Sequence, residues 1–161
     1  MIQTSYGKQK LKTYKKNSDQ GLMLGRQTED IAFAAGCTAT SAIVTPNEII
    51  VGNAGDSRAV LAKKVNGLYK AIELSEDHKP ELARERARIE KAGGFVEDNR
   101  VNGILNLSRS LGDLEYKNDS GRPLDEQMIT AIPEIKREPI DKDTHFLILA
   151  CDGIWDCKTS Q

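Results

Sequence analysis

Apolar residues are most concentrated in a run near the C-terminal end of the chain, and this run stops at an acidic residue. Residues 146–151 read Phe-Leu-Ile-Leu-Ala-Cys, and Asp152 and Gly153 follow them. A run of apolar residues without polar alternation is typical of a strand that is buried on both faces. The pattern therefore predicts a buried strand over residues 146–152 with a carboxylate at its end.

A second segment has the same order of apolar residues followed by an acidic one. Residues 49–54 read Ile-Ile-Val-Gly-Asn-Ala, and then a glycine precedes Asp56. A carboxylate at the end of a buried strand is costly to desolvate unless a cation or several donors meet it. Two such strands can form a site for a hard, oxygen-seeking cation. The alternative is that Gly55-Asp56 and Asp152-Gly153 only form turns, but Asp156, four residues past Asp152, favours the metal site.

The central part of the chain has the composition of consecutive β-strands. Thr, Ile and Val are frequent there, Pro46-Asn47 is a turn signal, and Asn66-Gly67 between apolar runs is typical of a hairpin. We predict four strands, at residues 38–45, 48–54, 58–62 and 68–72. Their meander order predicts an antiparallel sheet rather than parallel strands joined by helices.

One amphipathic helix is predicted over residues 79–92. Pro80 suits the first helical position and Gly93-Gly94 suits its end, while the mixed charges along the helix predict a solvated face. Other predicted elements are a short helix starting near residues 28–33, two short strands at 128–132 and 134–138 separated by Pro133, and a helix beginning within 157–161.

Composition and charge narrow the class of protein. The chain has 161 residues, of which 39% are hydrophobic and 29% charged, which is typical of a globular domain or part of one. The net charge of −1 indicates neither nucleic acid nor a membrane surface as a partner. We expect no transmembrane segment and no signal peptide, because no apolar stretch has the necessary length.

The cysteines and the N-terminal residues add two further expectations. Cys37, Cys151 and Cys157 form no paired framework, so we expect reduced thiols, two of them as small core residues, in an intracellular protein of the cytoplasm or nucleus. Residues 1–35 are a separate segment of basic and mixed composition. A surface segment is a simpler interpretation of its lysines than an interaction arm.

Six short motifs occur in a fixed order along residues 36–161. They are Gly36-Cys37-Thr38-Ala39, Gly52-Asn53-Ala54-Gly55-Asp56-Ser57-Arg58, Asp77-His78-Lys79-Pro80, Arg100-Val101-Asn102-Gly103, Leu107-Ser108-Arg109-Ser110-Leu111-Gly112-Asp113 and Asp152-Gly153-Ile154-Trp155-Asp156. Their order and spacing resemble the metal-dependent Ser/Thr protein phosphatases of the PPM type, also called type 2C. Six ordered motifs are far more specific than any one of them.

The resemblance implies a fold and a reaction. The fold is α+β, part of a four-layer αββα sandwich in which two antiparallel sheets pack face to face with helices outside both. The reaction is the hydrolysis of phosphoserine and phosphothreonine in phosphoprotein substrates by a water that bridges two metal ions, either Mn²⁺ or Mg²⁺. The complete domain holds two or three such ions. No side chain serves as a covalent nucleophile, so the resemblance assigns no catalytic residue here.

The resemblance also assigns metal ligands by position. Asp152 resembles a ligand of the catalytic metal pair, and Asp56 resembles the carboxylate that shares a further, weaker metal with it. Asp156 supports that same ion, and Gly153 permits close approach of the backbone. Residues 95–127 correspond to the region in which family members set substrate preference, although individual substrate contacts are not assigned.

Several of the family's motifs are missing from this chain. The family places a phosphate-binding Arg, a Glu-Asp pair and an Asp-Gly-His ahead of the first motif, and an Asp-Asn after the last one. Here the single Asp-Gly is at 152–153, and neither His78 nor His145 follows it. Residues 36–161 are therefore expected to be the central part of an incomplete phosphatase domain with little or no activity alone.

Two functions fit these motifs. The first is a metal-dependent Ser/Thr phosphatase, and the second is a pseudophosphatase that serves as a regulatory protein-binding module. The retained carboxylates at 56, 152 and 156 favour the enzyme, because a site that has lost its metals has no reason to keep buried charges. The sequence identifies neither the phosphoprotein nor the oligomeric state.

Overall fold

The computed structural model describes residues 35–161, which are mostly β-structure with few helices. The longer strands are β2 (Ala39–Val44), β3 (Glu48–Ala54), β4 (Arg58–Val65), β5 (Leu68–Glu73), β9 (Glu134–Pro139) and β10 (Thr144–Ala150). The short ones are β1 (Gly36–Cys37), β6 (Val96–Glu97), β7 (Arg100–Val101) and β8 (Leu111–Gly112). The helices are α3 (Ala83–Lys91), α4 (Asp152–Trp155) and the 3₁₀ turn η1 (Leu114–Tyr116).

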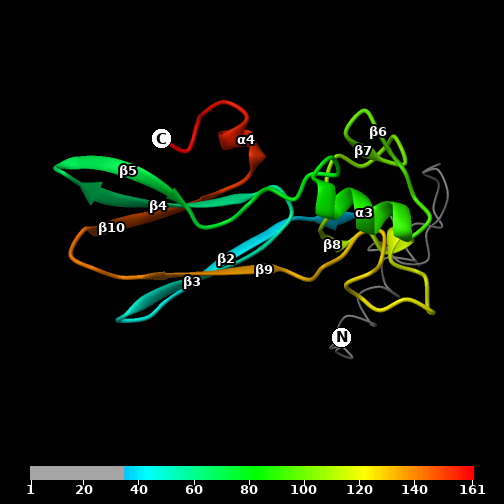
Figure 1. Cartoon of the computed structure of the whole chain (residues 1–161), viewed down its shortest axis with the longest axis horizontal. Helices are drawn as coiled ribbons and strands as arrows, with labels where there is room; N and C mark the ends of the chain where they lie inside the picture. The colour runs from blue at the N-terminus through cyan, green and yellow to red at the C-terminus, as the bar shows by residue number, and fades with distance from the viewer. Residues whose placement is uncertain (1–34) are drawn as a thin grey trace, which may run out of the picture.

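The longer strands form two antiparallel sheets of three strands each. One sheet has the order β2-β3-β9 and the other the order β10-β4-β5, and Figure 1 shows them as two layers at one end of the molecule. Ile49 and Val51 of β3 pack against Ala59 and Leu61 of β4, and Leu74 completes this buried cluster. The core therefore lies between the two sheets, as in a β-sandwich.

The predicted meander is divided between these sheets. Strands β2 and β3 pair with each other, and so do β4 and β5, but β3 and β4 lie in different sheets. The chain crosses from one sheet to the other at Gly55-Asp56-Ser57. The prediction of one four-stranded sheet was wrong because the apolar faces of β3 and β4 are buried against each other, which edge-to-edge pairing would not achieve.

The strand that is buried on both faces is β4 rather than the C-terminal apolar run. Ala59, Val60, Leu61 and Ala62 are all buried. Strand β10 pairs with β4 at the edge of the sheet, and its Phe146 remains 52% exposed. An apolar run predicts a strand but not the elements that cover it, so burial of residues 146–152 on both faces was a wrong expectation.

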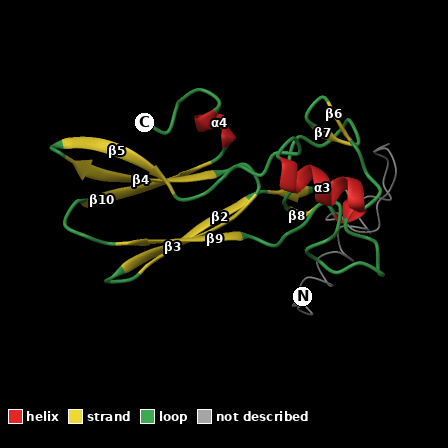
Figure 2. Cartoon of the chain, viewed as in Figure 1, coloured by secondary structure: helices red, strands yellow, loops and turns green. Residues whose placement is uncertain are grey.

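A second, smaller cluster lies beyond the ends of the sheets. Ile89 of α3 packs there with Val101 and Ile129, and Figure 2 shows α3 beside the β6–β7 hairpin and a long loop rather than over a sheet. Helix α3 begins at Ala83, later than predicted, because the backbone from Lys79 to Leu82 forms a turn.

Several smaller expectations also need correction. Residues 128–132 form no strand apart from a single bridge between Arg109 and Thr130. Residues 157–161 are not helical, since α4 already ends at Trp155. All three cysteines are free and exposed rather than core residues. The helix start predicted near residues 28–33 lies outside the described residues.

The fold class is confirmed in part. The two antiparallel sheets pack face to face as the resemblance implied, but the full four-layer sandwich is not seen in residues 35–161. Within this range no helix is both long enough and apolar enough to cross a membrane.

The face-to-face core predicts that Leu61→Ala destabilises the protein strongly. Leu61 is fully buried between the sheets, so we expect the free energy of unfolding to fall by about 3 kcal/mol through lost apolar contacts and a cavity. Urea unfolding followed by circular dichroism measures this change. Leu68→Ala on β5 is the matched control, because Leu68 is 71% exposed. Equal losses for the two variants would contradict the proposed position of the core.

Candidate functional site

Asp56 lies in the crossover between the two sheets, immediately before β4. Its side chain is only 4% exposed, and Oδ2 accepts a hydrogen bond from Lys79 Nζ at 2.5 Å. Burial would lower the pKa of Lys79, but the hydrogen bond and the charge of Asp56 outweigh it and leave that pKa raised. The structure thus places a buried carboxylate at the end of β3, where the sequence predicted one, and pairs it with an ammonium group.

The backbone around Asp56 is held from several directions. Gly55 has a φ of +116°, and a β-carbon there would lie 2.4 Å from Thr38 Cγ2, so no other residue fits without strain. The Ser57 hydroxyl is hydrogen-bonded to Thr38 Oγ1 at 2.7 Å. The Gly55 amide donates to His78 Nδ1 at 3.1 Å. The position of the Asp56 carboxylate is therefore determined by tight local packing.

His78 connects this turn to a neighbouring charged group. Its Nδ1 lies 3.1 Å from both the amide nitrogen and the carbonyl oxygen of Gly55, and its Nε2 lies 3.4 Å from Glu134 Oε2. The imidazole is completely buried, and burial together with the charge of Arg109 lowers its pKa. His78 is thus a neutral ring that supports the crossover backbone.

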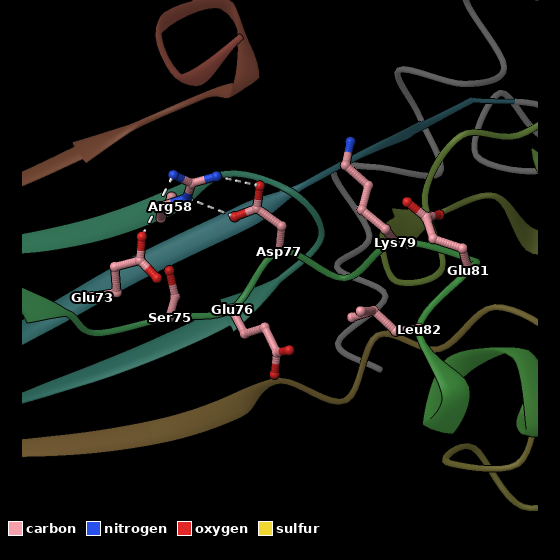
Figure 3. Close-up of a pocket in the computed structure, with 8 residues that line it drawn as sticks. All are labelled: Arg58, Glu73, Ser75, Glu76, Asp77, Lys79, Glu81 and Leu82. Atoms are coloured by element: carbon pink, nitrogen blue, oxygen red, sulfur yellow. Dashed lines mark hydrogen bonds and ion pairs between the residues drawn. The ribbon is translucent and has the colours of Figure 1, made fainter. Parts of the chain in front are cut away.

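Arg58 follows the crossover and forms a bidentate pair with Asp77. Its Nε and Nη2 donate to the two carboxylate oxygens of Asp77 at 2.9 and 2.8 Å. The guanidinium also lies 5.3 Å from the centre of the Trp155 ring. Arg58 and Asp77 line one side of a pocket of about 270 Å³, and Figure 3 shows Lys79 and Glu81 farther along it. Ser57 and Arg58 thus both have partners within the protein.

Asp152 lies at the same end of the β4–β10 pair as Asp56. The antiparallel register pairs Arg58, the first residue of β4, with Ala150, the last residue of β10, so Asp56 and Asp152 each lie two residues beyond this pair. Asp152 begins helix α4 and is half-buried. The chain segments that carry Asp56 and Asp152 therefore leave the same end of the β4–β10 pair, and their joint binding of a metal ion stays a prediction.

Asp156 and Gly153 lie in and just after α4. The Asp156 amide donates to the carbonyl of Asp152 at 2.7 Å, and the negative charge of Asp156 contributes to the raised pKa of Lys79. A β-carbon at Gly153 would meet only Cys151 Sγ, at an ordinary contact distance of 3.7 Å. The protein's own atoms therefore do not require glycine at this position, and its assignment as a close-approach residue stays a prediction.

The described residues do not make up a complete metal site. Carboxylate oxygens suit Mn²⁺ and Mg²⁺, but in residues 35–161 no group of three or more His, Cys, Asp or Glu side chains is arranged to hold an ion. Asp56 Oδ2 is also engaged by Lys79. The chemistry of the ligands fits a divalent cation, whereas their number and their present partners do not.

The sequence pattern missed a buried carboxylate in α3. Glu85 is 1% exposed and contacts Arg109 at 2.6 Å, Arg88 at 2.7 Å and the Ser108 hydroxyl at 2.7 Å. We expected this stretch of charges to be solvated. Its position in the helix could have indicated this burial, because Glu85 lies one turn before the buried Ile89 on the same side of the helix.

The Glu85 cluster ties α3 to the long loop that follows it. Arg88 also donates to the carbonyls of Gln127 and Ser108, and Arg109 donates to the carbonyl of Ile132. Burial alone would raise the pKa of Glu85, but the hydrogen bonds from Arg109 and Ser108 and the charge of Arg88 lower it to about 2. This carboxylate therefore stays ionised and organises the loop.

The family model and the curated proteins that this chain resembles are of the same kind. The family described as Protein phosphatase 2C matches residues 3–161. The chain is 50% identical over 145 residues to Protein phosphatase 2C homolog 2 of Schizosaccharomyces pombe, covering 89% of this chain and 38% of that protein. It is 52% identical over 122 residues to Probable protein phosphatase 2C 2 of Paramecium tetraurelia, covering 76% and 39%. The chain thus spans well under half the length of these relatives.

Solved structures that align with this chain are also described as phosphatases. A phosphatase from a pathogenic strain of Toxoplasma gondii aligns with a TM-score of 0.60 and 39% identity over 70% of this chain and 33% of its own. A serine-threonine phosphatase 2C from Toxoplasma gondii aligns with a TM-score of 0.67 and 21% identity over 95% of this chain and 48% of its own. At that lower identity, the second likeness supports the fold alone.

Ionised Glu85 predicts a specific loss of stability in acid. Its pKa lies below the ordinary 4.5, at about 2, so its contribution is fully present above pH 4.5 and is lost as the pH falls toward 2. We expect Glu85→Gln to lower the free energy of unfolding at pH 7 by on the order of 3 kcal/mol and to flatten its decline between those pH values.

Urea titrations at several pH values measure this difference between the original chain and the variant. Glu90→Gln is the control on the same helix, because Glu90 is exposed and lies 3.8 Å from Arg86, and it should change little. An unchanged acid dependence in Glu85→Gln would show that the Glu85 cluster does not stabilise the folded state.

Proposed function

The chain belongs to the protein phosphatase 2C family, and from this premise we propose that residues 36–161 are the central part of a phosphatase domain. In its complete form, this domain hydrolyses phosphoserine and phosphothreonine in other proteins. Relatives that are about 50% identical to this chain over most of its length are named as protein phosphatases 2C. The substrate is therefore a phosphoprotein.

The observation that carries this proposal is the shared end of strands β4 and β10. In the register of these strands, the segments that carry Asp56 and Asp152 leave the same end of the sheet. Asp56 is buried there and forms an ion pair with Lys79. A merely turn-forming Asp would not need to be buried. Carboxylates at this position are suited to divalent cations.

We propose Mn²⁺ or Mg²⁺ as the cofactor of the complete domain, with two or three ions and a water that bridges two of them. Asp152 would be a ligand of the catalytic pair, Asp56 and Asp156 would hold a further ion, and Gly153 would supply room nearby. Such ions lower the pKa of bound water and offset charge on the phosphoryl group. The residues 35–161 supply only part of the ligands that this requires.

The second candidate function is a pseudophosphatase that binds regulatory partners. The engagement of Asp56 by Lys79 favours it, because an ammonium group neutralises the carboxylate without any metal. The enzyme remains the better proposal, since a buried Asp56 and a half-buried Asp152 near one sheet end have no evident structural use, although Asp156 is exposed. Free thiols at all three cysteines suit a reducing compartment, so we propose an intracellular site of action.

The proposed function is tested with p-nitrophenyl phosphate and Mn²⁺. We expect residues 1–161 to hydrolyse it at or near the rate of the blank, because a partial set of ligands cannot hold two ions. The product of the reading frame extended at both ends to the length of the relatives should be active. In that product, Asp152→Asn should lower kcat/KM by at least about 100-fold.

The exposed Asp141, between β9 and β10, provides the control, and Asp141→Asn should retain full activity. Activity of residues 1–161 that disappears with Asp152→Asn would refute the incomplete domain. An extended product that is inactive but still binds phosphoproteins would instead support the pseudophosphatase.

A further inference from the structure

Two asparagines in the described part of the chain are each followed by glycine, at Asn66-Gly67 and Asn102-Gly103. In such a pair the glycine amide nitrogen can attack the carbonyl carbon of the asparagine side chain, because glycine has no β-carbon to obstruct the approach. The backbone does not distinguish the two asparagines, whose φ angles are 52° and 51°. Any difference in their reactivity is therefore decided by what surrounds each side chain.

The Asn102 side chain is held at both of its polar atoms. Its Oδ1 accepts a hydrogen bond from the Phe95 amide at 3.1 Å, and its Nδ2 donates to the Met128 sulfur at 3.4 Å. The Gly103 amide donates to the Arg100 carbonyl at 3.4 Å, so the attacking nitrogen is engaged as well. Asn102 is also half-buried. Ring closure at this pair would first have to break these hydrogen bonds.

The Asn66 side chain has none of these restraints. Asn66 and Gly67 are exposed at the tip of the β4–β5 hairpin, beyond the last strand pair, Val65 with Leu68. Within residues 35–161, neither the Asn66 side chain nor the Gly67 amide nitrogen has a hydrogen-bond partner. A β-carbon added at Gly67 would meet no atom within 4 Å. The group that attacks and the group that is attacked are therefore both free at this pair.

The space beside this turn admits both side-chain rotation and water. Asn66 and Gly67 line a hollow of about 460 Å³ together with Lys64 and Asp143. The Leu68 side chain that follows is 71% exposed, so the rest of the described chain does not cover the tip. Exposed turns open at a low cost in free energy. The asparagine can then reach the conformation in which its side chain approaches the next amide.

We propose that Asn66 is a site of spontaneous deamidation and isoaspartate formation, whereas Asn102 is protected by its contacts. The Gly67 nitrogen loses its proton to a base in solution and forms a bond to Asn66 Cγ, and the Cγ–Nδ2 bond breaks to release ammonia. Water then opens the resulting succinimide ring. Attack at the main-chain carbonyl of residue 66 gives isoaspartate, and attack at Cγ gives aspartate.

The product changes the turn itself. An isoaspartate carries the main chain through its β-carbon, which lengthens a two-residue turn whose geometry matches the twist of the strands. It also places a carboxylate in the hollow that Lys64 lines. Asn66 follows the last residue of β4, whereas Asp56 precedes the segment that leads into its first residue (Figure 1). The modification is thus remote from the candidate site and does not depend on the proposed function.

Peptide mapping of the 161-residue chain tests this selectivity. The protein is incubated in mildly alkaline buffer, and tandem mass spectra of its tryptic peptides assign each conversion of an amide to a carboxylate to one residue. We expect Asn66 to react at least about tenfold faster than Asn102, because hydrogen bonds raise the barrier at Asn102. Similar rates for the two asparagines, or a faster reaction of Asn102, would refute the proposal.

Unfolding provides the control for the role of the structure. In concentrated urea the contacts of Asn102 are lost, so the rates of the two asparagines should converge. A difference of the same size that persists in urea would show that the flanking sequence, and not the fold, protects Asn102, and it would contradict the inference.

The route through the ring is tested with a protein isoaspartate methyltransferase, which transfers a methyl group from S-adenosylmethionine to isoaspartate carboxylates. After incubation the original chain should accept methyl groups. Asn66→Gln should lose most of this acceptance, because the longer side chain closes a ring much more slowly. Asn118→Gln is the matched control and should accept as much as the original chain, since Asn118 is also exposed but precedes Asp119. No methylation of the incubated original chain, or full methylation of Asn66→Gln, would overturn the assignment.

Discussion

The carboxylate of Asp56 is buried at the point where the chain passes from one sheet to the other, and its charge has to be balanced there. Lys79 provides that balance, while Gly55, Ser57 and His78 hold the backbone around it. Because the crossover also separates β3 from β4, the same few residues determine both the division into two sheets and the position of the acidic group. The contacts around Asp56 therefore constrain both the fold and the candidate site.

The support of this crossover extends beyond the β-sandwich. His78 contacts Gly55 on one side and faces Glu134 on the other, and Glu134 in turn binds Arg84 of helix α3. Glu85, the next residue of this helix, forms ion pairs with Arg88 and Arg109. Buried charges of this kind are stable only when each has partners. The charged network therefore couples the position of α3 and its loop to the acidic crossover.

Several apolar side chains remain exposed on the two sheets, among them Ile43, Ile135 and Phe146. Apolar surface of this extent is unusual on a globular domain. The chain spans less than two fifths of the length of the curated relatives described above. Exposed apolar faces of this kind are consistent with the proposal that residues 36–161 are part of a larger domain.

The sequence by itself determined the family, the antiparallel strands and the two acidic strand ends, because apolar runs and ordered motifs are local properties that need no partner. Only the tertiary structure decided that β3 and β4 face each other, that β10 is an edge strand, and that Glu85 is buried while the cysteines are exposed. Burial and counter-charge depend on which distant residues pack together, as Lys79 and Asp56 do, and no local pattern records that choice.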